Sequence, residues 1–363
     1  MTNLRQWLLD AASLAASDLH LVTGYPPVRR ENGELVRVSD DQLSPQQIET
    51  AIQSICTPEQ YADFARDRNL DFAFTITDSD PPDKGPGQNC NQRFRANFFY
   101  HGEAPGACIR IIPSVIPNLE DNHFPLDLCD RITSFRNGLI IFSGVTGSGK
   151  TSSMAMILEK LAQLGGKRVV TIEDPVEFLF PNIGTSVITQ REVGRDVPCF
   201  ASGLRYALRQ DPDIILVGEI RDLETAQMAL SAAETGHLVL TTLHSRDAKG
   251  AISRLVDLFP SSSQHEIFSM LASGLRAVVC QHLLPNALPG ERRELALEVL
   301  LRSHGVTSGL RAGRIDNLDN AILAGRKDGM LVFDESLAEL LRQGRITETT
   351  ALQYATDVRQ LSR

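Results

Sequence analysis

A glycine-rich loop between an apolar run and a helix-forming segment constrains the fold of this chain more than any other feature. Residues 144–151 read Gly-Val-Thr-Gly-Ser-Gly-Lys-Thr, a complete G-x-x-x-x-G-K-[ST] pattern, with the apolar run 139–142 before it and the helix-forming run 152–158 after it. A strand, a glycine turn and a helix in this order direct unpaired backbone N–H groups and the positive end of the helix to one point, where a nucleotide phosphate fits. The pattern therefore predicts a phosphate-binding loop.

The polar residues of this loop have distinct expected tasks. The Lys150 ammonium would reach the β- and γ-phosphates, and the Thr151 hydroxyl would hold Mg²⁺. The alternative is a glycine turn that joins strand to helix without a ligand. The residues that we expect to contact the nucleotide are Gly144, Val145, Thr146, Gly147, Ser148, Gly149, Lys150, Thr151 and Ser152.

The overall composition narrows the class of protein. A chain of 363 residues can hold roughly two domains with real cores. Its net charge of −9 argues against broad, non-specific attraction to nucleic acid or anionic lipid. We see no signal peptide and no uncharged apolar run of the ~18 residues that a membrane-spanning helix needs, so we expect a cytoplasmic protein. The six cysteines are scattered without a C-x-x-C pair, which indicates neither a zinc site nor a disulfide framework.

A segment with three prolines, 112–125, is the best candidate for a boundary between domains. We place an N-terminal domain at 1–112, a linker at 113–125 and a second domain at 126–363. The first domain is expected to be a small α+β domain, and the run 78–91 a long flexible loop within it. Its expected elements are helices at 4–16 and 45–55 and strands at 19–22, 71–77, 93–100 and 108–112, the last three antiparallel neighbours.

Downstream of the boundary, short β-branched runs alternate with helical patterns. The runs are 138–142, 168–172, 214–217 and 237–242. Such alternation predicts an α/β fold with a mostly parallel sheet flanked by helices. From about 261 to 363 the chain is expected to be largely helical.

Carboxylates follow two of these apolar runs. Glu219 ends the segment 211–219 and is the expected general base or water-orienting residue. Gly218 stands where such strands usually carry a metal-holding aspartate, so another carboxylate must supply that function. Glu173 and Asp174, just past the run 169–172, are the candidates, of which Glu173 is preferred. For Glu219 and Glu173 the alternative is that they are solvated turn acids.

Histidines and arginines supply further candidates. His237 and His244 bracket the run 238–242. The neutral imidazole of one of them could polarise the γ-phosphate. The alternative is a histidine that is hydrogen-bonded within the fold and has no catalytic role. An arginine can stabilise a transferred phosphoryl group from the same chain or a neighbour, whereas the alternative is a solvated ion pair. The arginine candidates are Arg95, Arg110, Arg191, Arg205, Arg209 and Arg221.

With these motifs in order, the chain resembles the PilT-like branch of the type II/type IV secretion and pilus motor ATPases over nearly its whole length. The similar segments are 17–21 with 24–27, 93–97, the Walker A loop 144–151, the Asp box 171–177, 190–194, the Walker B segment 211–222 and the His box 233–244. The resemblance implies a PAS-like N-terminal domain, then a RecA-like ATPase domain with ATP near the domain junction of a hexameric ring.

The resemblance also implies roles for single residues. Lys150 and Thr151 would hold phosphate and Mg²⁺, Glu219 would be the catalytic glutamate, and Glu173 would take a metal or water role. His237 and His244 fill His-box positions. Arg95 and Arg110 match positions that approach the nucleotide across or within the ring.

The function implied by the resemblance is a hexameric Mg-ATPase that powers type IV pilus retraction and twitching motility. Its partner would be an inner-membrane platform protein of the pilus machinery, reached at the inner face of the cytoplasmic membrane, with no nucleic acid involved. The absence of an additional N-terminal domain and of a tetracysteine motif favours retraction, whereas 317–325 is a short form of the C-terminal motif of retraction ATPases. Three alternatives stay open: an ATPase of a conjugation or type IV secretion apparatus, a regulatory partner with little turnover that works with a paralogous motor, and a RecA-like nucleic-acid motor.

Overall fold

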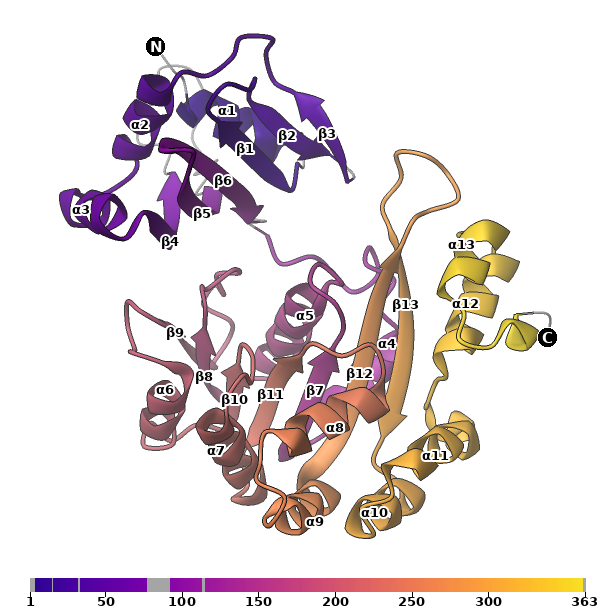
Figure 1. Ribbon diagram of the computed structural model, residues 1–363. Coiled ribbons are helices and arrows are strands. Elements are labelled where there is room, and N and C mark those ends of the chain that lie inside the picture. Colours follow the sequence, from indigo (N-terminus) through magenta and orange to yellow (C-terminus); the bar gives the residue numbers. More distant parts are fainter. Residues whose placement is uncertain (1–3, 15, 32, 77–91, 113–114, 362–363) are drawn as a thin grey trace. The chain divides into compact units, whose positions relative to one another are not determined.

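The computed structural model describes residues 4–14, 16–31, 33–76, 92–112 and 115–361. The chain forms two compact units, one containing the N-terminal 115 residues and the other almost all of the rest (Figure 1). Within the described ranges, no helix is both long and apolar enough to cross a membrane. The expected loop 78–91 lies outside the described residues.

In its described residues, the N-terminal unit is a six-stranded antiparallel sheet with helices on one face. The strand order is β3-β2-β1-β6-β5-β4. On β5, Phe94, Ala96 and Phe98 are buried in the helix-covered core, while Arg95 and Asn97 alternate with them on the other face. The elements are α1 (Leu4–Ser13), β1 (Asp18–Val22), β2 (Val28–Glu31), β3 (Glu34–Arg37), α2 (Pro45–Gln53), α3 (Pro58–Asp67), β4 (Asn69–Ile76), β5 (Gln92–His101) and β6 (Ala104–Ile112).

This unit confirms the expected α+β class and corrects some details. The three expected antiparallel strands are present as β4, β5 and β6, but β5 lies between the other two, so β4 and β6 are not neighbours. The strands β2 and β3 and the helix α3 were not expected. Their residues are mostly polar and half-buried or exposed, and α3 buries only Phe64, so few apolar residues mark these elements in the sequence.

The second unit is built on a seven-stranded sheet in the order β13-β12-β7-β11-β10-β8-β9, with helices on both faces (Figure 1). Every residue of β7, β10 and β11 is buried, as in strands that are covered on both sides. All neighbours pair in parallel except β12 and β13. The first elements are α4 (Leu126–Thr133), β7 (Gly138–Ser143), α5 (Lys150–Gln163), β8 (Arg168–Glu173), β9 (Val187–Glu192), α6 (Phe200–Ala207), β10 (Ile214–Val217), α7 (Leu223–Glu234) and β11 (Leu238–Leu243).

The expectation of a largely helical segment from 261 onward is wrong for residues 275–301. An antiparallel hairpin, β12 (Leu275–Leu284) and β13 (Glu294–Leu301), closes one side of the sheet there. The sequence of β13, Glu-Leu-Ala-Leu-Glu-Val-Leu-Leu, consists mostly of strong helix formers, and pairing with β12 overrides that preference. The remaining α-helices of the second unit are α8 (Ala248–Asp257), α9 (Gln264–Gly274), α10 (His304–Arg311), α11 (Leu318–Ala324), α12 (Phe333–Arg342) and α13 (Glu348–Tyr354).

The hairpin carries a half-buried carboxylate, Glu298 on β13. One oxygen of this side chain accepts a hydrogen bond of 2.7 Å from the backbone N–H of Ala248, the first residue of α8. Burial raises the pKa of Glu298 from its ordinary 4.5 to about 7, against the lowering effect of that hydrogen bond. The folded protein therefore binds this proton more tightly than the unfolded chain does.

This linkage predicts how the variant Glu298→Gln responds to pH. In the wild type, the Glu298 contribution to the free energy of unfolding falls as pH rises from about 4.5 through 7, because the unfolded chain ionises first. Glutamine lacks this titration, so the melting temperature of the variant relative to wild type should be higher at pH 8 than at pH 5. Calorimetry at both pH values checks this, with exposed Glu291→Gln as the control; an equal difference at both pH values would contradict the prediction.

Candidate functional site

The glycine-rich loop joins β7 to α5, as the sequence pattern predicts. Gly144, Gly147 and Gly149 have φ values of 145°, 78° and 87°, in the region that L side chains rarely adopt. A Cβ atom on Gly144 would lie 2.4 Å from the Gln281 carbonyl oxygen of β12 and 2.5 Å from Ser148 Oγ. Both the backbone conformation and the neighbouring strand therefore require glycine at this position.

The Lys150 side chain lies inside the loop and is only 7% exposed. Its ammonium donates hydrogen bonds to the carbonyl oxygens of Gly144 and Val145, at 2.8 and 3.0 Å. A buried cation next to the N-terminus of the 14-residue helix α5 is an arrangement that attracts an anion. Of the other loop residues, Val145, Thr146 and Gly147 are exposed, Gly144 and Ser148 are buried, and Gly149, Thr151 and Ser152 are half-buried.

The strand order brings the other candidates to the same edge of the sheet. The strands β7, β11, β10 and β8 are consecutive and parallel, so their carboxyl ends coincide. His244 directly follows β11, Glu219 lies two residues past β10, and Glu173 ends β8. In the sheet, β11 lies between β7, which leads into the loop, and β10, which precedes Glu219. The strands β7 and β10 are therefore roughly 10 Å apart.

Glu219 and His244 contact each other at this edge. Glu219 has a side chain only 11% exposed, and one of its oxygens lies 3.3 Å from His244 Nε2 while the other pairs with Arg221. Burial and the nearby Lys150 ammonium lower the pKa of His244 below 6.5, although Glu219 opposes them. At neutral pH His244 is therefore an uncharged imidazole beside a buried carboxylate, which suits an arrangement that positions water or donates to phosphate.

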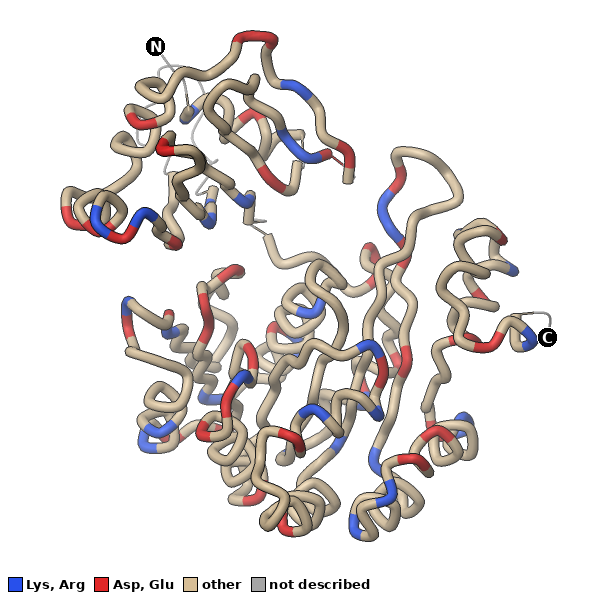
Figure 2. Tube along the Cα trace, viewed as in Figure 1, with Lys and Arg blue, Asp and Glu red and all other residues tan. Residues whose placement is uncertain are grey.

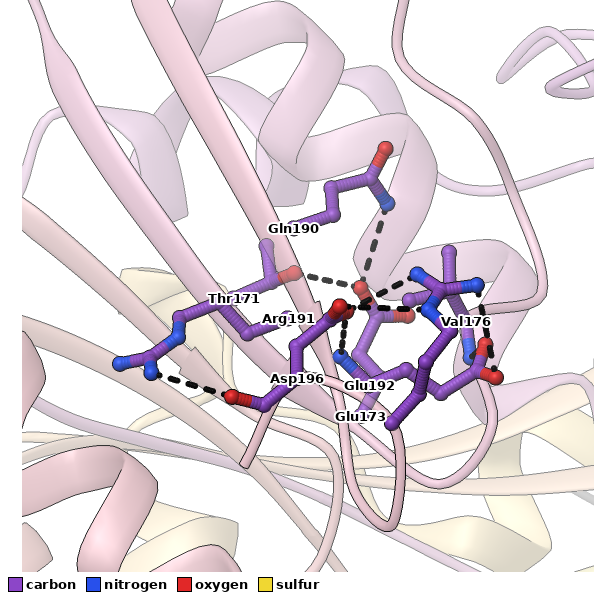
Figure 3. Close-up of polar contacts among 8 residues, drawn as sticks. Thr171, Glu173, Val176, Gln190, Arg191, Glu192 and Asp196 are labelled. Carbon is purple, nitrogen blue, oxygen red and sulfur yellow. Dashed lines mark hydrogen bonds and ion pairs between the residues drawn. The ribbon is translucent and has the colours of Figure 1, made fainter. Parts of the chain in front are cut away.

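Glu173 occupies the end of the neighbouring strand. One of its oxygens accepts hydrogen bonds from the Thr171 hydroxyl and the Gln190 amide, at 2.6 and 3.2 Å (Figure 3). Asp174, the alternative carboxylate, is exposed. A Cβ on Gly218 would lie 3.3 Å from the Ile172 carbonyl oxygen and 3.4 Å from Glu173 Cα. The end of β8 therefore leaves little room for a side chain at position 218.

The oxygen donors at this edge fit Mg²⁺ held together with a bound phosphate. The Thr151 hydroxyl and the carboxylates of Glu173 and Glu219 are hard ligands, the type that Mg²⁺ prefers. In the part of the chain that the structure describes, no group of three or more His, Cys, Asp or Glu side chains forms a closed metal site. Mg²⁺ at nucleotide sites commonly uses one or two protein ligands plus phosphates and water, so this sparse set is suitable.

His237 does not reach this edge. It precedes β11, and its Nδ1 lies 3.1 Å from the Ala232 carbonyl and 3.3 Å from Thr235 Oγ1. The whole length of β11, about 20 Å, separates it from His244. The two histidines of the motif are therefore at opposite ends of one strand, and only His244 shares the site with Glu219 in a single chain.

The arginine candidates lie in different surroundings. Arg221 pairs with Glu219, Arg205 pairs with Glu224, and Arg209 is exposed just after α6. Arg191 on β9 donates to the Asp196 carbonyl at 3.4 Å. Arg95 and Arg110 belong to the N-terminal unit, where they are direct cross-strand neighbours that pair with Asp71 at 2.7 Å and with Asp18 at 3.0 Å respectively.

Two hydroxyl side chains that the sequence analysis did not single out hold this edge in place. Ser143, fully buried at the end of β7, lies 2.8 Å from Ser245 Oγ and accepts a hydrogen bond of 3.0 Å from the Ser245 N–H, which joins the loop strand to the His244 turn. Thr242 donates to the Gly218 carbonyl at 2.6 Å. Hydroxyl groups at strand ends are common, so the sequence offers no signal that singles these two out.

A matched pair of glycine variants tests the conformation of the loop. Gly147→Ala adds a Cβ that meets no atom within 4 Å, so it should cost only the backbone strain of about 1–2 kcal/mol. Gly144→Ala adds both strain and overlap with backbone, and should cost about 3–5 kcal/mol. Calorimetric unfolding measures the two; equal effects would contradict the close approach of Gln281 to the loop.

The His244 environment predicts opposite pKa shifts in two variants. Removing the nearby ammonium in Lys150→Met should raise the pKa of His244, whereas removing the Glu219 charge in Glu219→Gln should lower it further. NMR titration of ¹³C-labelled histidine, with the signal assigned from His244→Gln, measures both. Shifts in the same direction would show that Lys150 and Glu219 do not both act on this imidazole.

Comparison with known proteins identifies a family and relatives of this chain. Residues 110–357 match the family model described as type II/IV secretion system protein. The chain is 36% identical over 353 residues to the type IV pilus retractation ATPase PilT of Pseudomonas aeruginosa, covering 97% of this chain and 98% of that protein. It is 34% identical over 345 residues to the type IV pilus ATPase PilU of the same species, covering 95% and 86%.

A known structure agrees with these sequence relatives. A crystal structure of the pilus retraction motor PilT with bound ADP superposes with a TM-score of 0.85 at 34% identity, and the match covers 100% of this chain and 99% of that one. The expected α/β class, an N-terminal α+β domain before a RecA-like P-loop domain, is thereby confirmed. The chain belongs to the type II/IV secretion system family and is a PilT-like ATPase.

Proposed function

We propose that this ATPase is a Mg²⁺-dependent motor that works as a hexamer and couples ATP hydrolysis to the retraction of type IV pili. The observation that carries the proposal is the convergence of Lys150, Glu219 and His244 at one sheet edge of a PilT-like chain. The similarity to a pilus retraction motor over almost the whole length supports the choice of machine.

In the proposed chemistry, the loop N–H groups and Lys150 bind the β- and γ-phosphates. Thr151 and Glu173 would hold Mg²⁺, which, when bound, would neutralise charge that develops on the transferred phosphoryl group. Glu219 orients the attacking water and accepts its proton, and the buried position of its carboxylate excludes competing solvent. His244, uncharged at neutral pH, positions Glu219 and can donate toward the γ-phosphate.

The proposed assembly divides the chain into a PAS-like domain (1–112), a linker (113–125) and the ATPase domain (126–363). Arg95 and Arg110 would reach a nucleotide of the same or a neighbouring subunit once their pairs with Asp71 and Asp18 open. Arg191, Arg205 and Arg209 are candidates for contacts between subunits. ATP binding and hydrolysis would then bias two arrangements of the domains, which is the usual origin of force in such a cycle.

The proposed partners are the other subunits of the ring and an inner-membrane platform protein of the pilus machinery. The protein would act in the cytoplasm, at the inner face of the cytoplasmic membrane, and would associate with the membrane only through these partners. We propose no nucleic-acid partner, because basic and acidic residues are interspersed through both units (Figure 2) and the net charge is −9.

A second candidate function is that of a pilus ATPase that assists a paralogous motor. The chain is 34% identical to PilU and 36% identical to PilT. Because the two identities are nearly equal, this second candidate stands beside the retraction motor. The family description also covers secretion systems, so an ATPase of a secretion or conjugation apparatus is the remaining alternative.

The variant Glu219→Gln tests the motor chemistry. Because the amide cannot accept the proton of water, kcat for ATP should fall about 10²–10⁴-fold while binding of ADP is retained. Hydrolysis measured against protein concentration, together with light scattering, reports both turnover and ring formation. Turnover of the wild type no higher than that of the variant would overturn the motor proposal and favour the assisting role.

The matched control is Glu266→Gln, which makes the same chemical change at an exposed position on α9. It should leave kcat within about two-fold of wild type, because surface substitutions away from a site have small effects.

Deleting the gene and scoring twitching motility then separates pilus retraction from a secretion role. Only pilus retraction predicts that the deletion abolishes surface movement and leaves secretion intact.

A further inference from the structure

Two side chains on neighbouring strands hold a single oxygen of Glu173 (Figure 3). Thr171 and Glu173 lie two residues apart on β8 and therefore share a face of the sheet, and Gln190 of β9 is the direct cross-strand partner of Thr171. Thr171 is fully buried, and its hydroxyl donates to Glu173 Oε1 at 2.6 Å, while Gln190 Nε2 donates to the same oxygen at 3.2 Å.

The orientation of the Gln190 amide follows from its other contact. Gln190 Oε1 accepts a hydrogen bond of 3.1 Å from the backbone N–H of Phe180. A backbone N–H can only donate, so the amide oxygen must face Phe180 and the NH₂ group must face Glu173. The opposite orientation would set N–H against N–H and oxygen against carboxylate. The backbone thus fixes Gln190 as a donor to Glu173.

The edge strand β9 also holds the chain that follows Glu173. Glu192, a buried carboxylate on β9, accepts a hydrogen bond of 3.1 Å from the Val176 N–H, and the Val193 N–H donates to the Glu173 carbonyl at 2.8 Å. Glu192 is in turn fixed through its own N–H, which donates to Asp196 at 2.8 Å (Figure 3). The backbone is therefore tied to β9 at the Glu173 carbonyl and again at Val176.

We propose that Thr171 and Gln190 are positioning residues that orient the Glu173 carboxylate for the divalent metal of the bound nucleotide. The inference rests on the metal role of Glu173 in the proposed function. Two donors on one oxygen stabilise the ionised carboxylate and hold its plane, so the ligand needs no reorientation when the metal arrives. Partners of this kind typically change metal affinity or activity by about 10–100-fold when they are removed.

The variant Thr171→Val tests this directly, because valine matches the shape of threonine and lacks the hydroxyl donor. The measurement is the affinity for a fluorescent ADP analogue in EDTA and again with Mn²⁺, which gives the gain in affinity that the metal provides. We expect that gain to fall at least about ten-fold in Thr171→Val, with affinity in EDTA within about two-fold of wild type. Thr171→Ser, which keeps the hydroxyl, should restore the gain.

Two further variants make each outcome decisive. Gln190→Leu removes the second donor and should reduce the metal-dependent gain in affinity in the same way. If Thr171→Val does not fold, Gln190→Leu takes its place as the test variant. If Glu173→Gln loses the gain while Thr171→Val and Gln190→Leu keep it, the positioning inference is wrong and the proposed function stands. If Glu173→Gln itself keeps the gain, the metal role of Glu173 fails and the inference fails with it.

Discussion

The parallel alignment of four consecutive strands is the constraint on which the rest of the site depends. Because β7, β11, β10 and β8 run in the same direction, whatever follows each of them arrives at one edge of the sheet. The glycine loop, His244, Glu219 and Glu173 are far apart in the chain and meet only for this reason. By the same constraint His237, which precedes β11, lies at the opposite edge of the sheet.

The charged side chains of Lys150 and Glu219 at this edge are buried, and each has polar partners. The Lys150 ammonium is buried among loop carbonyls, and the Glu219 carboxylate is buried against His244 and Arg221. The imidazole between them has its pKa lowered by burial and Lys150 and raised by Glu219, with the lowering effects dominant. A site of this kind binds an anion on one side and holds a neutral donor and a carboxylate ready on the other, which is what phosphoryl transfer to water requires.

Much of the fold could be predicted because its signals are local. The runs 138–142, 168–172 and 214–217 are buried strands in the structure, within a residue at either end, and the loop 144–151 has the expected position between strand and helix. The hairpin β12–β13 could not be found in this way. Its second strand has the composition of a helix, and its pairing with β12, itself paired with β7, makes it extended.

The sequence by itself determined the phosphate loop, the identity of the carboxylates and the alternation that requires a parallel sheet, because each depends on residue type and on spacing over short distances. Only the tertiary structure decided which of two histidines shares the site and which side chains hold Glu173. Thr171 and Gln190 are 19 positions apart, and nothing in their local sequence joins them. They meet because β9 pairs with β8 in one register, and register is set by the packing of the whole sheet.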